Sequence, residues 1–248
     1  GKQIHEEIIR RGLGKDLVIG TALIDMYAKC GVLKRAQEIL EELPIRDLVS
    51  WSAVIEGYVH QGGGLEALNC YKQLENEGLS LDAVVFISIL KACGKLGALE
   101  KGERFHKEIM KMGSHEKNTM IGNVLMDMYV KCGELSKAQE VLECLPVRDV
   151  VSWNTVINGY ARQGKSHEAL ICFDQMQREG IFPDAVTFVC ILNACGAMIN
   201  ADNGKEIHDQ IMRKGLLVEN DSILTNSLVN MYAKCSSLAM ARDLFEDL

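Results

Sequence analysis

Apolar residues recur every three to four positions along the chain, which is the spacing of amphipathic helices. One such stripe, at i, i+3, i+4 and i+7, consists of Trp153, Val156, Ile157 and Tyr160. A second stripe consists of Ala169, Leu170, Phe173 and Met176. Between the stripes, Gly164 suits a left-handed helix C-terminus and Ser166 suits a helix N-cap. This segment is therefore predicted to form a helix–turn–helix.

The helical pattern itself repeats at offsets of 101 to 103 residues. Met-Tyr-Ala-Lys-Cys at 26–30 returns as Met-Tyr-Val-Lys-Cys at 128–132 and unchanged at 231–235. Arg-Asp-Leu-Val-Ser-Trp at 46–51 returns, with Val for Leu, at 148–153. Because neither helix of a unit could bury its stripe alone, successive pairs must stack. The expected fold is an all-α solenoid of stacked helix–turn–helix repeats.

Each long period divides into a short, a standard and a long unit, and residues 1–248 are expected to form one repeat array. In chain order the predicted units are a partial long unit 1–16, short 17–47, standard 48–82, long 83–118, short 119–149, standard 150–184, long 185–221 and partial short 222–248.

Composition narrows the possible functions. The chain is 48% apolar and 25% charged, as in an ordinary folded protein. Its net charge of −7 argues against a general polyanion binder, although net charge does not describe how charge is distributed on one face. No uncharged apolar stretch of about 18 residues occurs, so no membrane association is predicted. The chain starts without Met or a basic presequence and stops in mid-pattern, so we interpret it as a fragment.

No catalytic, metal or cofactor site is predicted. The nine cysteines are odd in number, lack the two-residue gap of zinc sites, and are expected to be buried free thiols. His106 and Glu108 match half of a zinc deaminase signature, but its Pro-Cys-x-x-Cys half is absent. His5, His106 and His208 share one repeat position and are interpreted as packing residues. Gly62–Gly64 lacks the Lys-Ser/Thr of a phosphate loop.

Three segments of one unit resemble the pentatricopeptide repeat family: Val-Val-Ser-Trp-Asn-Thr-Val-Ile-Asn-Gly-Tyr at 150–160, Glu-Ala-Leu at 168–170, and Met176 with Gly180 and Pro183-Asp184. The alternation of unit lengths resembles its plant PLS-type subclass. The resemblance implies a right-handed superhelix whose first helices line one surface. It also implies single-stranded RNA binding in a plant mitochondrion or chloroplast, for C-to-U editing or another maturation step. A C-terminal deaminase domain often follows in this subclass and would lie outside this fragment, so the chain itself is not expected to be an enzyme.

The resemblance further implies that the fifth and last residues of each repeat read one base. The implied pairs are Thr21 with Asp47 and Ser52 with Asp82 for G, and Asn123 with Asp149 and Asn154 with Asp184 for a pyrimidine, U being favoured. Asn226 would start another pyrimidine pair. Two long-unit pairs, Ile87 with Asn118 and Val189 with Asp221, have an apolar reader and are expected to set spacing. The implied target is roughly 5′-GGnUUnY-3′.

Two further sets of residues would support the RNA. The second residue of each repeat would sandwich the bases, namely Val18, Val49, Val84, Met120, Val151, Val186 and Ile223. The thirteenth residues would form a phosphate-binding stripe, namely Lys29, His60, Lys95, Lys131, Arg162 and Lys234, with Ala197 as the exception.

Plainer interpretations remain open at this stage. The aspartates could serve only as helix caps, and the cations could serve only to stabilise helix C-termini. The whole array could instead be a scaffold that binds proteins. An accessory editing factor could also bind an apolar outer face of the long units.

Overall fold

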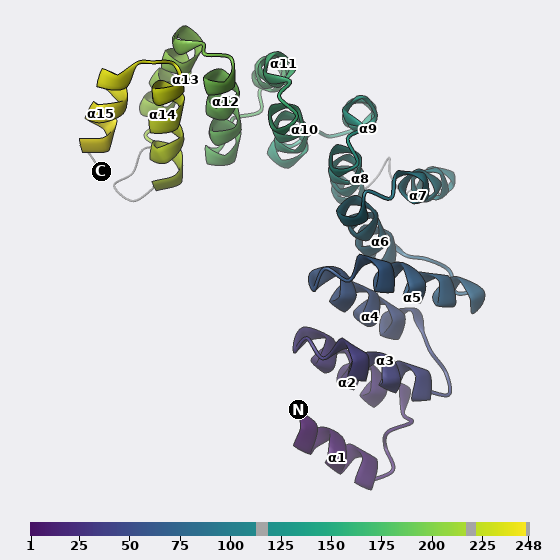
Figure 1. Ribbon diagram of the computed structural model, residues 1–248. Coiled ribbons are helices and arrows are strands. Elements are labelled where there is room, and N and C mark those ends of the chain that lie inside the picture. The colour runs from purple at the N-terminus through teal and green to yellow at the C-terminus, as the bar shows by residue number, and fades with distance from the viewer. Residues whose placement is uncertain (113–118, 217–221, 247–248) are drawn as a thin grey trace. The chain divides into compact units, whose positions relative to one another are not determined.

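The computed structural model describes residues 1–112, 119–216 and 222–246, and every regular element within these ranges is an α-helix (Figure 1). The chain forms two compact units, Gly1–Cys132 and Gly133–Leu248. The first unit contains α1 (Lys2–Arg10), α2 (Leu17–Lys29), α3 (Leu33–Glu42), α4 (Leu48–His60), α5 (Gly64–Asn76), α6 (Ala83–Leu96), α7 (Leu99–Lys111) and α8 (Thr119–Lys131). The second contains α9 (Leu135–Cys144), α10 (Val150–Arg162), α11 (Ser166–Arg178), α12 (Ala185–Ala197), α13 (Ala201–Arg213), α14 (Ser222–Lys234) and α15 (Leu238–Glu246).

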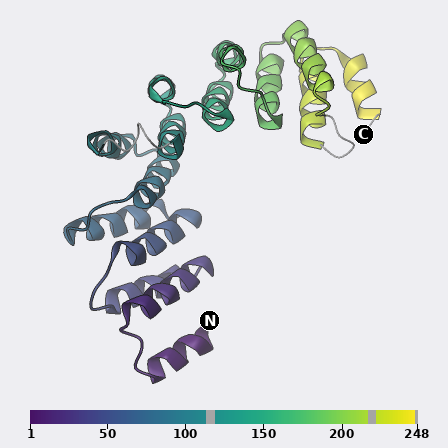
Figure 2. The ribbon, with the colours of Figure 1, turned by 180° about the vertical axis from the view of Figure 1, so that it is seen from behind.

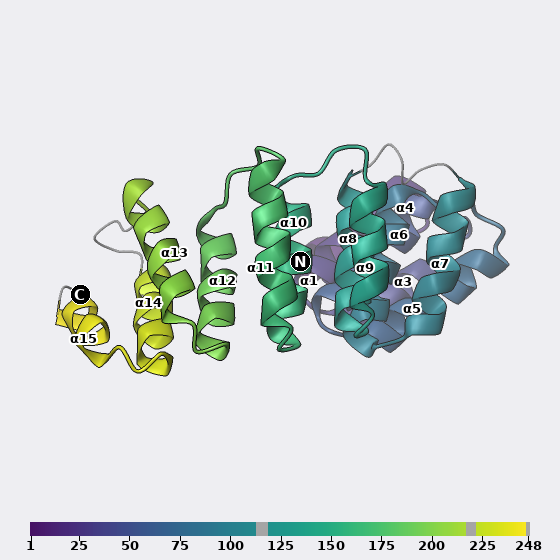
Figure 3. The same ribbon diagram turned by 90° about the horizontal axis from the view of Figure 1, so that it is seen from above.

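Within each unit, the helices stack as successive hairpins. In the first unit α2 packs on α4, α4 on α6, and α6 on α8, while α3, α5 and α7 each pack against the first helices on either side of them. In the second unit α12 lies between α10 and α14, as Figures 1 and 3 show and as Figure 2 shows from behind. The predicted all-α solenoid is therefore confirmed.

The even-numbered helices are the first helices of their repeats, and each begins at the first residue of a predicted unit. Residues 17, 48, 83, 119, 150, 185 and 222 are these starts. One predicted cap is wrong. Ser166 was expected to cap α11, but Lys165 occupies the N-cap and Ser166 is the first helical residue, with a buried hydroxyl that has no hydrogen-bond partner in the described chain.

The core lies between successive hairpins and is built from aromatic and aliphatic side chains. Tyr71 and Phe105 pack edge to face with ring centroids 4.9 Å apart, and Phe173 and Phe188 do so at 6.1 Å. Trp153 is fully buried. Such pairs bury a large apolar area and define how each hairpin sits on the next.

The cysteines are free thiols, and five of the nine are buried as expected. The buried ones are Cys70, Cys93, Cys172, Cys190 and Cys195. Burial raises the pKa of each to about 11, so they remain protonated and act as small apolar groups. Cys30 and Cys144 are exposed, because they lie outside the helix stripes that face the core.

The three repeated histidines each pair with a tyrosine of the following first helix. The Nδ1 atom and the tyrosine hydroxyl are 3.0 Å apart for His5 and Tyr27, 2.8 Å for His106 and Tyr129, and 3.0 Å for His208 and Tyr232. The two rings in each pair also meet edge to face. These contacts link a long repeat to the next short one, which agrees with a packing role for the histidines.

Acidification should destabilise these His–Tyr contacts. Burial lowers the pKa of both His5 and His208; Arg35 reinforces the shift at His5, and Asp209 opposes it at His208. Below a pH of about 6.5 the unfolded chain therefore binds more protons than the folded chain. Stability consequently decreases as the pH is lowered through this range. Urea unfolding at pH 7.5 and 5.5 should show a lower midpoint at 5.5. Replacing both histidines by Gln should reduce this difference, and an unchanged difference would contradict the assignment.

Candidate nucleic-acid interface

A row of aliphatic side chains is exposed at the start of the first helices. It consists of the predicted sandwiching residues Val18, Val49, Val84 and Met120 in the first unit and Val151, Val186 and Ile223 in the second. Their exposed fractions lie between 48% and 77%. A single exposed apolar residue needs no explanation, but the same register in seven helices does. Each unit thus presents a row of exposed aliphatic groups that could make apolar contact with planar ligands.

The four predicted reading aspartates are helix N-caps. Asp47, Asp82, Asp149 and Asp184 each accept, at Oδ1, a hydrogen bond from the backbone N–H of the third helical residue. The capping interpretation is therefore correct. Capping does not exclude base reading, because the cap bond occupies only one of the two carboxylate oxygens.

One predicted reading pair is in direct contact. The Asn154 amide Nδ2, on α10, donates to Asp184 Oδ1 over 3.0 Å, and the two residues are both half-buried. The hydroxyl of Thr187, at the start of α12, donates to Asn154 Oδ1 over 2.6 Å. Val151 is exposed on α10, three residues before Asn154. Val186 is exposed on α12, two residues after Asp184.

The other predicted pairs differ from this one. Ser52 donates its hydroxyl to the Leu48 carbonyl over 2.6 Å, and no Ser52–Asp82 bond forms in the described chain. The Ser52 hydroxyl thus bonds on its own helix, as serine hydroxyls in helices can. The Thr21 hydroxyl is buried without a hydrogen-bond partner in the described residues, so it makes no bond to Asp47.

The remaining candidate readers lie on the first helices α6, α8, α12 and α14. Asn123 Oδ1 on α8 is also buried and lacks a hydrogen-bond partner among the described residues, while Asp149 belongs to the second unit. Asn226 is exposed on α14. Ile87 and Val189 are half-buried, and their predicted partners Asn118 and Asp221 lie outside the described residues.

The predicted phosphate stripe occupies the last turn of the first helices. Lys29, His60, Lys95, Lys131, Arg162 and Lys234 are all exposed there. Gly94 and Gly196 leave room for two of the lysine stems, since a Cβ on either would lie 3.2 Å from Cδ of Lys131 or Lys234, respectively. The position also suits the helix dipole, so both interpretations of these cations are consistent with the structure.

Carboxylates one turn earlier neutralise part of this stripe, which the sequence interpretation missed. Asp25 and Asp127 contact the Nζ atoms of Lys29 and Lys131 at 2.7 and 2.5 Å. Hydrogen bonding to Asp25, the largest cause, raises the pKa of Lys29. The spacing of four residues is the signal that would have revealed these pairs. In the second unit asparagines hold the same register, at Asn158, Asn193 and Asn230.

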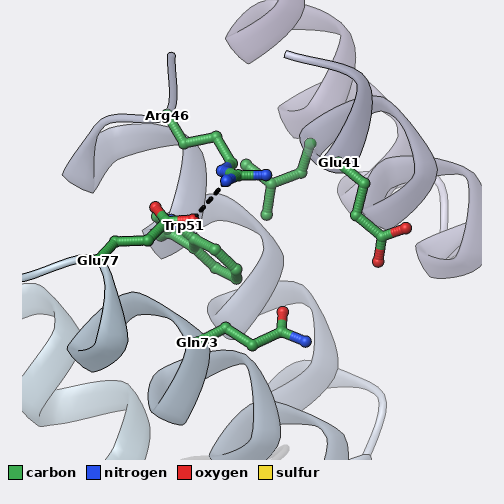
Figure 4. A pocket seen from close by; sticks show the side chains of 6 residues that line it. Glu41, Arg46, Trp51, Gln73 and Glu77 are labelled. Atoms are coloured by element: carbon green, nitrogen blue, oxygen red, sulfur yellow. Dashed lines mark hydrogen bonds and ion pairs between the residues drawn. The ribbon is translucent and has the colours of Figure 1, made fainter. Parts of the chain in front are cut away.

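A small pocket lies beside the loop that carries Asp47 (Figure 4). Its lining residues are Leu40, Glu41, Arg46, Trp51, Gln73 and Glu77, and it has a volume of about 230 Å³. Glu77 accepts a hydrogen bond from Trp51 Nε1 over 2.8 Å and pairs with Arg46 Nη2 at 2.7 Å. These bonds tie the end of α5 to α4 and to the loop before it. We interpret the pocket as a structural clamp that positions Asp47.

All six lining residues recur 102 positions later, but the second clamp is weaker. The recurring residues are Leu142, Glu143, Arg148, Trp153, Gln175 and Glu179. Arg148 again pairs with Glu179. The Trp153 indole N–H, however, is buried without a hydrogen-bond partner in the described chain.

Removing the glutamate should therefore cost more in the first clamp than in the second. Glu77→Ala removes an ion pair and leaves the Trp51 N–H without its acceptor, whereas Glu179→Ala removes the ion pair alone. The difference in unfolding free energy should be about 1 kcal/mol, the usual net value of one hydrogen bond. Urea denaturation of the two single variants measures it. Equal losses would show that the Trp51–Glu77 bond contributes nothing to stability.

The second helices of the long repeats, α7 and α13, do not have the apolar outer face that was expected of them. Their solvent side was expected to be apolar, but on α7 it consists mainly of Lys101, Arg104, Lys107 and Lys111, with Met110 beside them. On α13 the exposed residues are likewise mostly charged. The helices are strongly amphipathic, so their apolar residues are used up in the core.

In the described residues, no group of three or more His, Cys, Asp or Glu side chains could hold a metal ion. Nor does any helix in this part of the chain have the length and hydropathy needed to cross a membrane.

Comparison with known proteins places the chain in a family. A profile of the PPR repeat family matches residues 148–197, and the PPR repeat itself matches 21–48, 49–79, 84–114, 123–150 and 223–248. A chloroplastic pentatricopeptide repeat-containing protein of Arabidopsis thaliana is 36% identical over the whole chain, which covers 40% of that protein. A putative mitochondrial one from the same plant is 34% identical, and the chain covers 39% of it.

Solved structures share the fold. The pentatricopeptide repeat protein PPR10 from maize aligns with a TM-score of 0.69 at 23% identity, covering 90% of this chain and 33% of that one. The PPR domain of Arabidopsis thaliana protein-only RNase P 1, solved with tRNA, aligns with a TM-score of 0.56 at 15% identity, covering 72% and 95%. At these identities the similarity establishes the solenoid fold. The profiles matched along most of the chain establish more: the chain belongs to the PPR repeat family.

Proposed function

We propose that this chain binds single-stranded RNA on the surface formed by the first helices of its repeats, reading one base per repeat. The observation that carries the proposal is the Asn154–Asp184 contact at 3.0 Å, with the exposed side chains of Val151 and Val186 at the starts of the same two helices. An amide held by a carboxylate offers directed donors and acceptors, and flanking aliphatic groups offer apolar contact to base faces.

The proposed register follows the repeats from the N-terminus. The target is roughly 5′-GGnUUnY-3′, with G at Thr21–Asp47 and Ser52–Asp82 and U at Asn123–Asp149 and Asn154–Asp184. The unpaired hydroxyl of Thr21 and carbonyl of Asn123 support roles as readers, because each has a hydrogen-bonding capacity that the described protein does not use. Asn226 would accept a pyrimidine.

The biological setting is proposed from the relatives. Two of them are labelled chloroplastic and mitochondrial, so we place the full-length protein in a plant organelle. The alternating repeat lengths support the PLS-type subclass and a role in C-to-U editing or another step of transcript maturation. This chain would bind and not catalyse; any deaminase chemistry would reside outside its 248 residues. An accessory protein on the long repeats would have to dock through charge, given the lysines of α7.

Binding to a fluorescent GGAUUAU oligonucleotide tests the proposal directly. Anisotropy should show saturable binding that weakens when the UU is changed to GG and when salt is raised. A DNA oligonucleotide and a scrambled RNA of equal composition are the controls. Equal weak binding to all four oligonucleotides would favour the protein-scaffold interpretation, in which the groove receives a peptide.

A further inference from the structure

A closed hydrogen-bond network joins the reader of one repeat to the first helix of the next. Asn154 donates to Asp184, and the Thr187 hydroxyl lies 2.6 Å from Asn154 Oδ1 and 2.8 Å from Asp184 Oδ1. The Thr187 backbone N–H also donates to Asp184 Oδ1 over 2.9 Å. Thr187 is completely buried, so its hydroxyl serves the network and not solvent.

Charge decides which way the Asn154 amide faces. Burial, the largest effect, raises the pKa of Asp184, but hydrogen bonds from the Thr187 backbone, the Asn154 amide and the Thr187 hydroxyl together lower it below its usual value. Asp184 is therefore ionised at neutral pH and only accepts. The amide nitrogen must face it, which turns the amide oxygen toward Thr187.

The Thr187 hydroxyl then limits rotation of the amide. The terminal torsion of asparagine has a broad, two-fold preference and is poorly restrained by itself. A hydroxyl at 2.6 Å gives the amide oxygen a partner that is lost when the group turns. One N–H and one oxygen lone pair of Asn154 remain available, in fixed directions.

The equivalent residues of other repeats do not act in this way. In the first unit Ser50, at the same register, donates its hydroxyl to the Asp47 carbonyl over 2.8 Å, and Thr21 is left without a partner in the described chain. Val85 has no hydroxyl, and Ser52 bonds to its own helix. Among these three repeats, only 150–184 has a reader held by both the last residue and the next helix.

We propose that Thr187 is a specificity-determining positioning residue, which restricts the repeat 150–184 to uracil over cytosine. This rests on the RNA binding proposed above. The free N–H and lone pair of Asn154 match the adjacent acceptor and donor of the uracil edge. Cytosine presents the opposite order, N3 as acceptor and its amino group as donor. Reading cytosine would require the amide to turn over, and Thr187 together with Asp184 opposes that turn.

The test compares Thr187→Val, which removes the hydroxyl at nearly constant volume, with Thr187→Ser, which keeps it. Dissociation constants are measured for GGAUUAU and GGAUCAU, which differ only at the base opposite this repeat. The wild type should prefer U, Thr187→Val should reduce the U:C ratio about three- to tenfold, and Thr187→Ser should preserve it. Changing the second G to A, opposite the repeat 48–82, is the internal control, and its ratio should not move in any variant.

The outcomes separate this inference from the proposed function. Failure of the wild type to bind any of these RNAs would refute the proposed function itself. Binding with an unchanged U:C ratio in Thr187→Val, or an equal change at both tested bases, would overturn the role of Thr187. Side-chain amide exchange of Asn154 in the free protein, measured by NMR, gives a readout without RNA. It should be faster in Thr187→Val than in the wild type, and equal rates would also overturn the inference.

Discussion

A chain carrying Asn123→Thr and Asn154→Thr should prefer GGAGGAU over GGAUUAU, reversing the preference of the wild type. Both changes copy the Thr–Asp pair that this chain already has at Thr21 and Asp47. The amide of asparagine offers a donor and an acceptor side by side, whereas a threonine hydroxyl offers one rotatable donor. A base that leaves a reader unpaired should lose about 1 to 2 kcal/mol, or roughly tenfold in affinity per base.

The affinity for each RNA should change by roughly a hundredfold, because the two readers lie in separate repeats and the free-energy effects at the two bases should add. Asn158→Thr with Asn193→Thr is the matched control. These asparagines also lie on first helices, α10 and α12, but at the register of the stripe carboxylates and not of the readers. A preference that shifts equally in both double variants would show that the substitutions act through helix stability and not through base reading. Unchanged weak binding in the reader variant would leave a non-specific groove.

Removing cations from the second unit should weaken RNA binding more than removing them from the first. Lys29 and Lys131 are each held by a carboxylate, at 2.7 and 2.5 Å, so a phosphate must compete with Asp25 or Asp127 for the ammonium. Arg162 and Lys234 make no ion pair within the described residues, and asparagine stands one turn before each. Arg162→Ala with Lys234→Ala should therefore reduce affinity about tenfold and lower the slope of log Kd against log salt by about 0.7 per phosphate lost.

The opposite change should tighten binding. Asp25→Asn with Asp127→Asn releases Lys29 and Lys131 and removes two negative charges near the RNA, so affinity should rise and the salt slope should steepen. Glu6→Gln with Glu168→Gln removes the same charge from exposed second helices and is the control. A salt slope that does not change in either pair of stripe variants would show that these cations stabilise helix ends and do not meet phosphate.

Part of the candidate interface could be predicted from the sequence, because it depends only on the position of each residue relative to the start of its own helix. An aspartate or asparagine before each amphipathic stripe marks a helix start, and the residue two places later in the chain occupies the same point of every first helix. The exposure of Val18 or Val151 follows from that register, since it lies off the apolar stripe. The same reasoning placed Arg162 and Lys234 in the last turn of their helices. It failed for Ser166, where the chain enters the helix one residue earlier than the capping preference suggests.

What the sequence determined by itself is the repeat, its helices and the register of every candidate reader, because periodicity and capping act over a few neighbouring residues. Only the tertiary structure decided which partner each polar side chain chose. Asn154 and Ser52 hold the same repeat position, yet one bonds across to Asp184 and the other to its own helix. Trp51 and Trp153 are equivalent, yet only Trp51 donates to a glutamate in the described chain. Hydrogen bonds require heavy atoms within about 3 Å, so the choice depends on side-chain length and on how adjacent hairpins pack, which no single repeat encodes.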